Sequence, residues 1–171
     1  MIQRTTVGSS RRLRVGIPHR DATTRHFTTV SRKVILDPYF FVYAGQGDRG
    51  RSLGDMYILN LKENNCEWKR VVMSKPPGYR HQHTLVGDDS IKNATIKYLF
   101  GGINTPDNTF YNDLWILDLS PGIVYDTNQP EVSGIKFVLQ TTTGNKPRER
   151  KGHCAFIYHR KMFIYGGQCQ D

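Results

Sequence analysis

The sequence predicts an all-β protein of repeated four-stranded antiparallel sheets, arranged as an incomplete β-propeller. Three observations predict this fold class. A proline, arginine and histidine motif recurs at a fixed spacing, an aromatic strand ending in small residues follows it, and a strand that opens with an aspartate follows that. Because the three landmarks keep one order along the chain, we interpret each copy as one structural unit.

The first landmark is a proline, an arginine and a histidine, each separated by two residues. Two copies lie 70 residues apart: Pro77-x-x-Arg80-x-x-His83 and Pro147-x-x-Arg150-x-x-His153. Each histidine opens an apolar stretch, which predicts the inner strand of a sheet. A weaker copy begins at His26, with Thr23 in place of the arginine.

The second landmark is an aromatic-rich strand that ends in small residues. It occurs as Tyr98–Gly102 and Phe163–Gly167, and as Phe41–Gly45 with Ala44 in place of the first glycine. The spacing from His26 to His83 is 57 residues, and Ala44 lies the same distance before Gly101. Glycine has no β-carbon, so the pair lets the end of a strand pass close to its neighbour.

The third landmark is an aspartate followed by an aromatic residue within an alternating strand. Asn112–Leu119 matches Gly54–Leu61, and a fourth strand is predicted after each, at Ile135–Leu139 and Cys66–Val71. We expect the aspartates, Asp55 and Asp113, to accept backbone hydrogen bonds in a turn.

The landmarks divide the chain into a basic flexible segment (1–22) and a repeat region (23–171), with units at about 23–73, 77–141 and a partial one at 147–171. One four-stranded sheet cannot bury both faces, so we expect the units to stack face to face. Propellers close with about 4–8 such units, called blades. This chain is therefore expected to be a truncated product or fragment, to assemble with its own copies, or to form an open arc. An unrelated antiparallel sandwich is the alternative fold.

The recurring set resembles the kelch repeat over about residues 23–167. The resemblance rests on the glycine pair, Asn112-Asp113-Leu114-Trp115 and the Pro-x-x-Arg-x-x-His motif. Departures are Ala44, Phe137 where tryptophan is usual, and a third copy that stops at its second strand. The resemblance implies a protein–protein interaction module or adaptor, as in ubiquitin-ligase substrate receptors, cytoskeletal scaffolds and transcription cofactors. The alternative is a fragment of a propeller enzyme, galactose-oxidase-like or sugar-processing.

Function in propellers lies in the loops, and the sheets are scaffold. The resemblance implies that the arginine before the inner strand lies near the mouth of the central channel, so Arg80 and Arg150 are expected to bind partner carboxylates. The alternative is that they brace the blade. The full set of predicted partner-binding residues is Arg49, Arg51, Tyr79, Arg80, Asn104, Asp107, Phe110, Arg148 and Arg150. The residues predicted to be structural are His83, Gly101, Gly102, Asp113, Trp115, His153, Gly166 and Gly167.

Charge and cysteine content limit the class of partner. The net charge is +9, but residues 1–33 hold eight basic residues against one acidic residue. We interpret this as a solvated tail; a mitochondrial transit segment and a nucleic-acid-binding arm are the alternatives. The three cysteines favour neither a disulfide framework nor a zinc site, and a reducing compartment follows. We expect a cytoplasmic protein, with nucleus or mitochondrion as alternatives, that uses no cofactor or metal, binds proteins with acidic segments and does not cross a membrane.

Overall fold

The computed structural model describes residues 35–36, 39–62, 66–88, 95–105, 107–121, 123, 126 and 128–170. These residues form β-strands and one 3-10 turn, η1 (Asp48–Gly50), with no α-helix among them. The predicted all-β class is confirmed. None of the described residues forms a helix able to span a membrane. The basic segment and the strand predicted to open at His26 lie outside the described residues.

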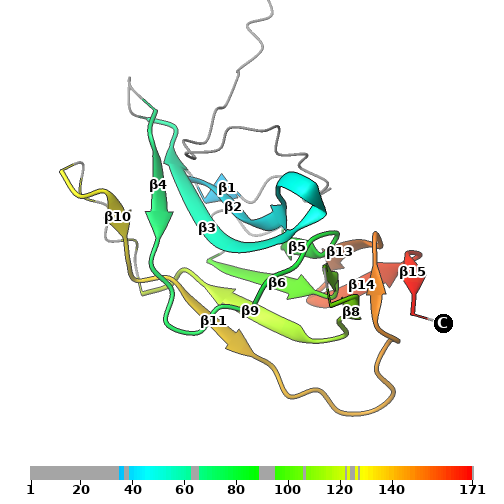
Figure 1. Ribbon diagram of the computed structural model, residues 1–171. Coiled ribbons are helices and arrows are strands. Elements are labelled where there is room, and N and C mark those ends of the chain that lie inside the picture. Colours follow the sequence, from blue (N-terminus) through cyan, green and yellow to red (C-terminus); the bar gives the residue numbers. More distant parts are fainter. Residues whose placement is uncertain are drawn as a thin grey trace, which may run out of the picture.

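The first blade is a five-stranded sheet (Figure 1). Its order is β1 (Ile35–Leu36), β2 (Tyr39–Gln46), β3 (Ser52–Asn60), β4 (Trp68–Val71) and β10 (Glu131–Val132). The first four strands are antiparallel neighbours, and β10 joins the outer edge in parallel. Three predicted strands of copy one are therefore present in order, in β2, β3 and β4.

The second blade matches the predicted four-stranded unit. Its order is β11-β9-β6-β5, and every pair is antiparallel. The strands are β5 (Thr84–Gly87), β6 (Ile96–Phe100), β9 (Leu114–Asp118) and β11 (Lys136–Leu139). The chain between β6 and β9 forms a small hairpin of β7 (Ile103–Asn104) and β8 (Thr109–Phe110).

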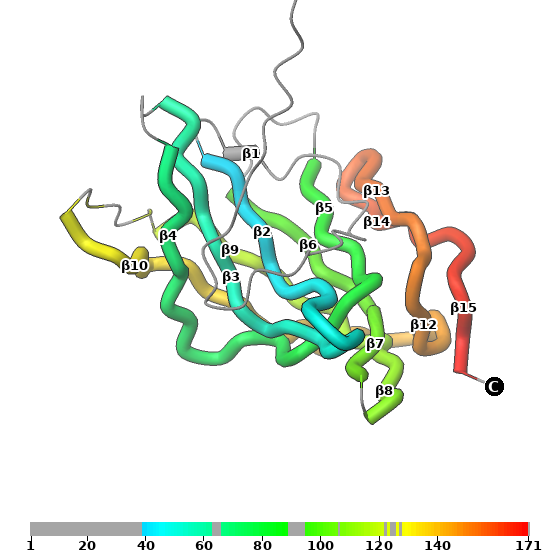
Figure 2. The backbone as a smooth tube through the Cα atoms, turned by 45° about the horizontal axis from the view of Figure 1, so that its top comes forward, coloured from blue at the N-terminus to red at the C-terminus, as the bar shows by residue number. Residues whose placement is uncertain are grey.

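The third unit has two of the four strands, as the sequence predicts. Strand β13 (Cys154–Tyr158) pairs with β14 (Lys161–Tyr165) over five residue pairs. Strand β12 (Arg150–Lys151) pairs with β15 (Gln168–Cys169). The three units lie side by side in chain order, so that β13 and β14 form one end of the array (Figure 2).

The long connection between β9 and β11 contains a strand that joins the first blade. Its strand β10 adds to β4, and the Val72 amide donates to the Val132 carbonyl at 2.9 Å. The ammonium group of Lys69 donates to the carbonyls of Asp126 and Gln129 at 2.5 and 2.7 Å. Unpaired backbone groups on an outer strand attract another strand. Strand β10, in the connection between two strands of the second blade, thus covers the edge strand β4 of the first blade.

The core runs through both complete sheets. Met56 and Ile58 of the first blade and Leu99 and Leu117 of the second are fully buried in one cluster. Phe137 extends this cluster and packs on Tyr43 with ring centroids 4.9 Å apart. The smaller aromatic at this outer-strand position therefore still bridges the two blades.

One contact recurs wherever two units meet. The ring of His83 lies edge-on to Tyr43 of the preceding blade, with centroids 5.7 Å apart. The ring of His153 lies in the same way on Phe100, at 5.4 Å. Tyr43 and Phe100 occupy the same repeat position, as do the two histidines. The histidines of the first landmark are thus packing residues between units.

The second glycine of each pair adds a repeated backbone contact. The amide of Gly45 donates to the Arg80 carbonyl, and the amide of Gly102 donates to the Arg150 carbonyl, both at 2.9 Å. A β-carbon on Gly102 would lie 2.8 Å from the carbonyl oxygen of His81 in its own blade, and Gly102 has φ +99°. Glycine is required there by both space and conformation.

We predict that Gly102→Ala lowers the free energy of unfolding by about 1–3 kcal/mol more than Gly45→Ala. Gly45 has a similar φ of +111° but no atom within 4 Å of an added β-carbon, so it is a matched control for backbone strain alone. Urea denaturation of both variants measures the difference. Equal losses would show that crowding against His81 contributes nothing.

We also predict that stability falls between pH 7.5 and 5. Burial, reinforced by Arg80, His153 and His81, lowers the pKa of His83 to about 3, and burial lowers the pKa of His153 to about 4. In the unfolded chain a histidine titrates near 6.5, so protonation below that pH favours unfolding. His83 alone should cost about 2 kcal/mol over this range.

The control for this prediction is His83→Phe, which retains an aromatic ring against Tyr43 but cannot be protonated. Between pH 7.5 and 5, its unfolding free energy should fall by about 2 kcal/mol less than that of the wild type. If both proteins lose stability in parallel as the pH falls to 5, His83 is not the group responsible.

Candidate functional site

Loops from all three units meet along one edge of the molecule. We call this surface the rim and define it as residues 47–53, 77–82, 101–105, 107–112 and 146–152. The hydroxyl of Thr105 donates to the Gly50 carbonyl at 2.5 Å, joining the first two blades. The Arg150 amide donates to the Tyr111 carbonyl at 3.1 Å, joining the second blade to the third unit. The rim is therefore one continuous surface.

A buried serine fixes the part of the rim that η1 contributes. The Ser52 hydroxyl lies 2.9 Å from His81 Nδ1 and donates to the Ile103 carbonyl at 3.3 Å. The same oxygen accepts the Thr105 amide hydrogen bond at 2.9 Å. Burial, followed by the charge of Lys151, lowers the pKa of His81. Sequence reasoning missed Ser52, His81 and Thr105, because none of them belongs to a repeated landmark.

Arg80 is corrected from a partner contact to an internal brace. Its side chain is fully buried, and its guanidinium donates to both carboxylate oxygens of Asp113 at 2.8 Å. It also donates to the carbonyls of Gly101, at 3.0 Å, and Pro77. The ring centroid of Tyr111 lies 4.2 Å from the guanidinium carbon. No surface of Arg80 is left for a partner's carboxylate.

Asp113 also differs from its predicted role. We expected it to accept backbone hydrogen bonds in a turn. Instead it accepts from the side chain of Arg80 and from Trp115 Nε1, the latter at 2.6 Å. Asp113 thus connects Trp115, the other signature residue of the third landmark, to the arginine of the first landmark. In the second unit this contact joins the two landmarks.

Arg150 repeats part of the Arg80 arrangement but stays partly exposed. It donates to the Gly166 carbonyl at 2.9 Å, as Arg80 does to the Gly101 carbonyl, and to the Arg148 carbonyl at 3.1 Å. In the described structure, Arg150 is therefore a partly exposed residue of the rim.

The structure brings the other predicted partner residues together on the rim. Arg49, Arg51, Tyr79, Asp107 and Arg148 are exposed, and Asn104 and Phe110 are partly exposed. The amide of Asn104 donates to Asp107 at 2.8 Å, and Arg148 donates to the Gln170 carbonyl at 2.8 Å. Sequence reasoning missed two further residues of the rim, Lys151 and Tyr111. The ammonium of Lys151 lies 4.9 Å from the ring centroid of Phe110. The hydroxyl of Tyr111 donates to the Tyr79 carbonyl at 3.5 Å.

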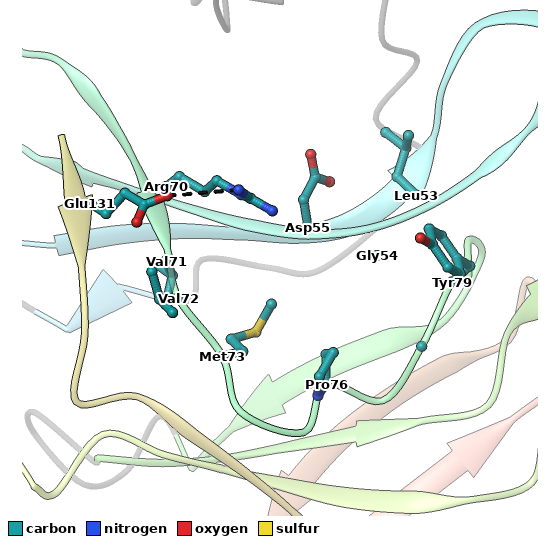
Figure 3. A pocket seen from close by; sticks show the side chains of 11 residues that line it. Leu53, Gly54, Asp55, Arg70, Val71, Val72, Met73, Pro76, Tyr79 and Glu131 are labelled. Carbon is teal, nitrogen blue, oxygen red and sulfur yellow. Dashed lines mark ion pairs between the residues drawn. The ribbon is translucent and has the colours of Figure 1, made fainter.

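A cavity of about 540 Å³ lies beside the rim, between β3, β4 and the connection to the second blade. Figure 3 shows Tyr79 at one end, the ion pair of Arg70 and Glu131 at the other, and Asp55 between them. Nη1 of Arg70 lies 3.7 Å from Oε1 of Glu131. The lining also includes Leu53, Val71, Met73 and Pro76. The described residues hold no cluster of three or more metal-ligating side chains.

The fold and the ordered landmarks agree with comparisons to known proteins. The family described as the KLHDC2/KLHL20/DRC7 Kelch-repeats domain matches residues 22–171. Adagio protein 3 of Arabidopsis thaliana is 31% identical over 134 residues, covering 76% of this chain and 18% of the relative. Kelch domain-containing protein 3 of Mus musculus is 25% identical over 135 residues, covering 79% of this chain and 30% of the relative. The chain thus spans less than a third of the length of each of these two relatives.

A solved structure shows the same fold. The structure of YjhT superposes with a TM-score of 0.55 at 20% sequence identity, covering 90% of this chain and 36% of the other. Together with the family match over nearly all of the repeat region, the geometry leaves one assignment: the chain belongs to the kelch-repeat family.

Proposed function

We propose that this chain is a protein–protein interaction module that binds an acidic segment of a partner along the rim. The observation that carries the proposal is the continuity of the rim: loops from three units form one surface that presents basic and aromatic side chains, with the ammonium of Lys151 over the ring of Phe110. Tyrosine and arginine are enriched where proteins bind each other. Loops held by rigid sheets are the usual carriers of such contacts.

The charge of the rim supports an acidic partner. Apart from Arg80, which Asp113 neutralises, the rim holds six basic residues: Arg49, Arg51, Lys146, Arg148, Arg150 and Lys151. Three acidic residues oppose them, namely Asp48, Asp107 and Glu149. Complementary charge guides association and fixes the orientation of a partner. Arginine adds planar, two-pronged hydrogen bonding to carboxylates.

The cavity beside Tyr79 gives the rim a place to anchor an apolar side chain. Its volume, about 540 Å³, lies within the range of about 300–1,000 Å³ that ligand pockets span. Leu53, Met73 and Pro76 supply its apolar wall. A partner segment that combines acidic residues with one large apolar residue would use both features.

A catalytic role has no specific observation in its favour. The histidines that a propeller enzyme could use, His83 and His153, are buried between units and packed on aromatic rings. A reducing compartment such as the cytoplasm is supported by the cysteines of the described part of the chain, Cys66, Cys154 and Cys169, none of which forms a disulfide.

We predict that the chain binds a fluorescein-labelled peptide of alternating glutamate and leucine, and that Arg148→Ala or Arg49→Ala weakens binding by about fivefold or more. Fluorescence anisotropy measures both. Arg160→Ala is the matched control, because Arg160 is exposed in the turn between β13 and β14, away from the rim. Equal weakening by Arg160→Ala, or equal binding of a lysine–leucine peptide, would contradict an acidic partner at the rim.

We predict that Arg80→Met lowers the free energy of unfolding by about 3–5 kcal/mol, because Asp113 loses its buried partner. Arg148→Met should change it by less than about 0.5 kcal/mol, since Arg148 is exposed. The double variant Arg80→Met/Asp113→Leu should recover part of the loss. Unchanged denaturation of Arg80→Met would reject the brace, and peptide binding by the folded variant would show that Arg80 makes no contact.

A further inference from the structure

The cavity beside the rim has a charged end and an apolar wall. The ion pair of Arg70 and Glu131 lies at one end, and Tyr79 lies at the other (Figure 3). Met73 and Pro76 line the wall between these ends. A side chain that fills this cavity therefore needs an apolar body and a polar tip.

The charged end is formed where β10 joins the first blade. Glu131 is the register partner of Arg70, and Lys69 holds the preceding turn through the carbonyls of Asp126 and Gln129. Nη1 of Arg70 lies 3.7 Å from Oε1 of Glu131, which is an ion pair but too long for a hydrogen bond. Because a hydroxyl both donates and accepts hydrogen bonds, one ligand hydroxyl can bind the carboxylate and the guanidinium together.

The exposure of the ion pair limits the kind of tip that fits. The side chain of Arg70 is 62% exposed and that of Glu131 is 49% exposed, so a ligand can reach both. An aliphatic group would cover these charges without offering them a hydrogen bond, which costs free energy. A cation would be attracted by Glu131 but repelled by Arg70. A neutral hydroxyl matches both charges, and tyrosine carries one at the tip of a large apolar side chain.

The wall of the cavity suits an aromatic ring. Tyr79 is 63% exposed, and a β-carbon on Gly54 would lie 3.3 Å from Cδ1 of Tyr79, so the glycine lets this ring lie close to β3. Aromatic rings pack favourably on one another and on the sulfur of a methionine such as Met73. Tyr79 also belongs to the rim, which means that a segment bound along the rim can place one side chain in the cavity.

We propose that the cavity binds a tyrosine side chain of the acidic partner segment. Its ring packs between Tyr79 and Met73, and its hydroxyl binds Arg70 and Glu131. This inference rests on the proposed function, because the tyrosine belongs to the segment that binds the rim. The arginines of the rim attract any acidic segment, whereas the cavity selects among such segments.

The test compares peptides that differ at one position. The fluorescein-labelled peptide of alternating glutamate and leucine is made with its central leucine replaced by tyrosine or by phenylalanine, and fluorescence anisotropy gives each Kd. The tyrosine peptide should bind wild type about fivefold or more tightly than the phenylalanine peptide, because only tyrosine carries the hydroxyl. Tyr79→Ala should weaken the binding of both peptides to a similar extent, since its ring contacts either one.

A variant of the charged end identifies the group that binds the hydroxyl. Glu131→Ala should reduce the preference for tyrosine over phenylalanine to about twofold or less, because the acceptor is lost. Glu67→Ala is the matched control and should keep the full preference, since Glu67 is an exposed glutamate next to β4 that does not line the cavity. Exposed ion pairs contribute little to stability, so Glu131→Ala should fold; Arg70→Met replaces it if circular dichroism shows otherwise.

Equal binding of the tyrosine and phenylalanine peptides by wild type would overturn the tyrosine site, as would a preference that Glu131→Ala leaves intact. Tighter binding of a peptide with lysine at the central position would overturn it too, because the cavity would then select a cation. In each of these cases, weaker peptide binding by Arg148→Ala would still support an acidic partner at the rim. If none of the peptides bound, both proposals would be rejected.

Discussion

The packing of a histidine ring against an aromatic ring of the preceding sheet is the contact on which the rest of this structure depends. It closes the interface between the first and second blades at Tyr43 and His83, and it recurs between Phe100 and His153. The glycine amide beside each aromatic residue binds the following unit at the same time. These two weak interactions occur together at each interface and recur at a fixed register. They thereby set the spacing and the order of the sheets.

The arginine brace ties this interface to the surface above it. Arg80 lies between the glycine carbonyl of its own blade, the carboxylate of Asp113 and the ring of Tyr111. Tyr111 in turn contacts Tyr79, and its neighbour Phe110 contacts Lys151. The buried ion pair therefore holds the base of the rim, while exposed arginines around it remain available to a partner. A residue type usually associated with recognition is used here for support at one position and is exposed at others.

Sequence reasoning succeeded where the same physical contact occurs more than once. Recurrence at spacings of 57 and 70 residues located the strands and the interface histidines, because each copy must meet its neighbour in the same way. Features that occur once were beyond its reach. Ser52 and Thr105 join two loops through a contact without a repeat, and the pairing of β10 with β4 depends on where a long connection returns in space. Arg80 was ambiguous, because its sequence spacing fits bracing and binding equally; only its burial and its bonds to Asp113 separate the two.

The coupling energy between Phe100 and His153, measured with a double-mutant cycle by urea denaturation, tests the account most directly. Phe100→Leu, His153→Leu and the double variant isolate this ring contact between the second and third units from the burial of either side chain. The account predicts a favourable coupling of about 0.5–1.5 kcal/mol, the range for edge-to-face ring pairs. Additive losses would contradict it, because the histidine would then pack as an ordinary buried side chain and would not hold one unit to the next.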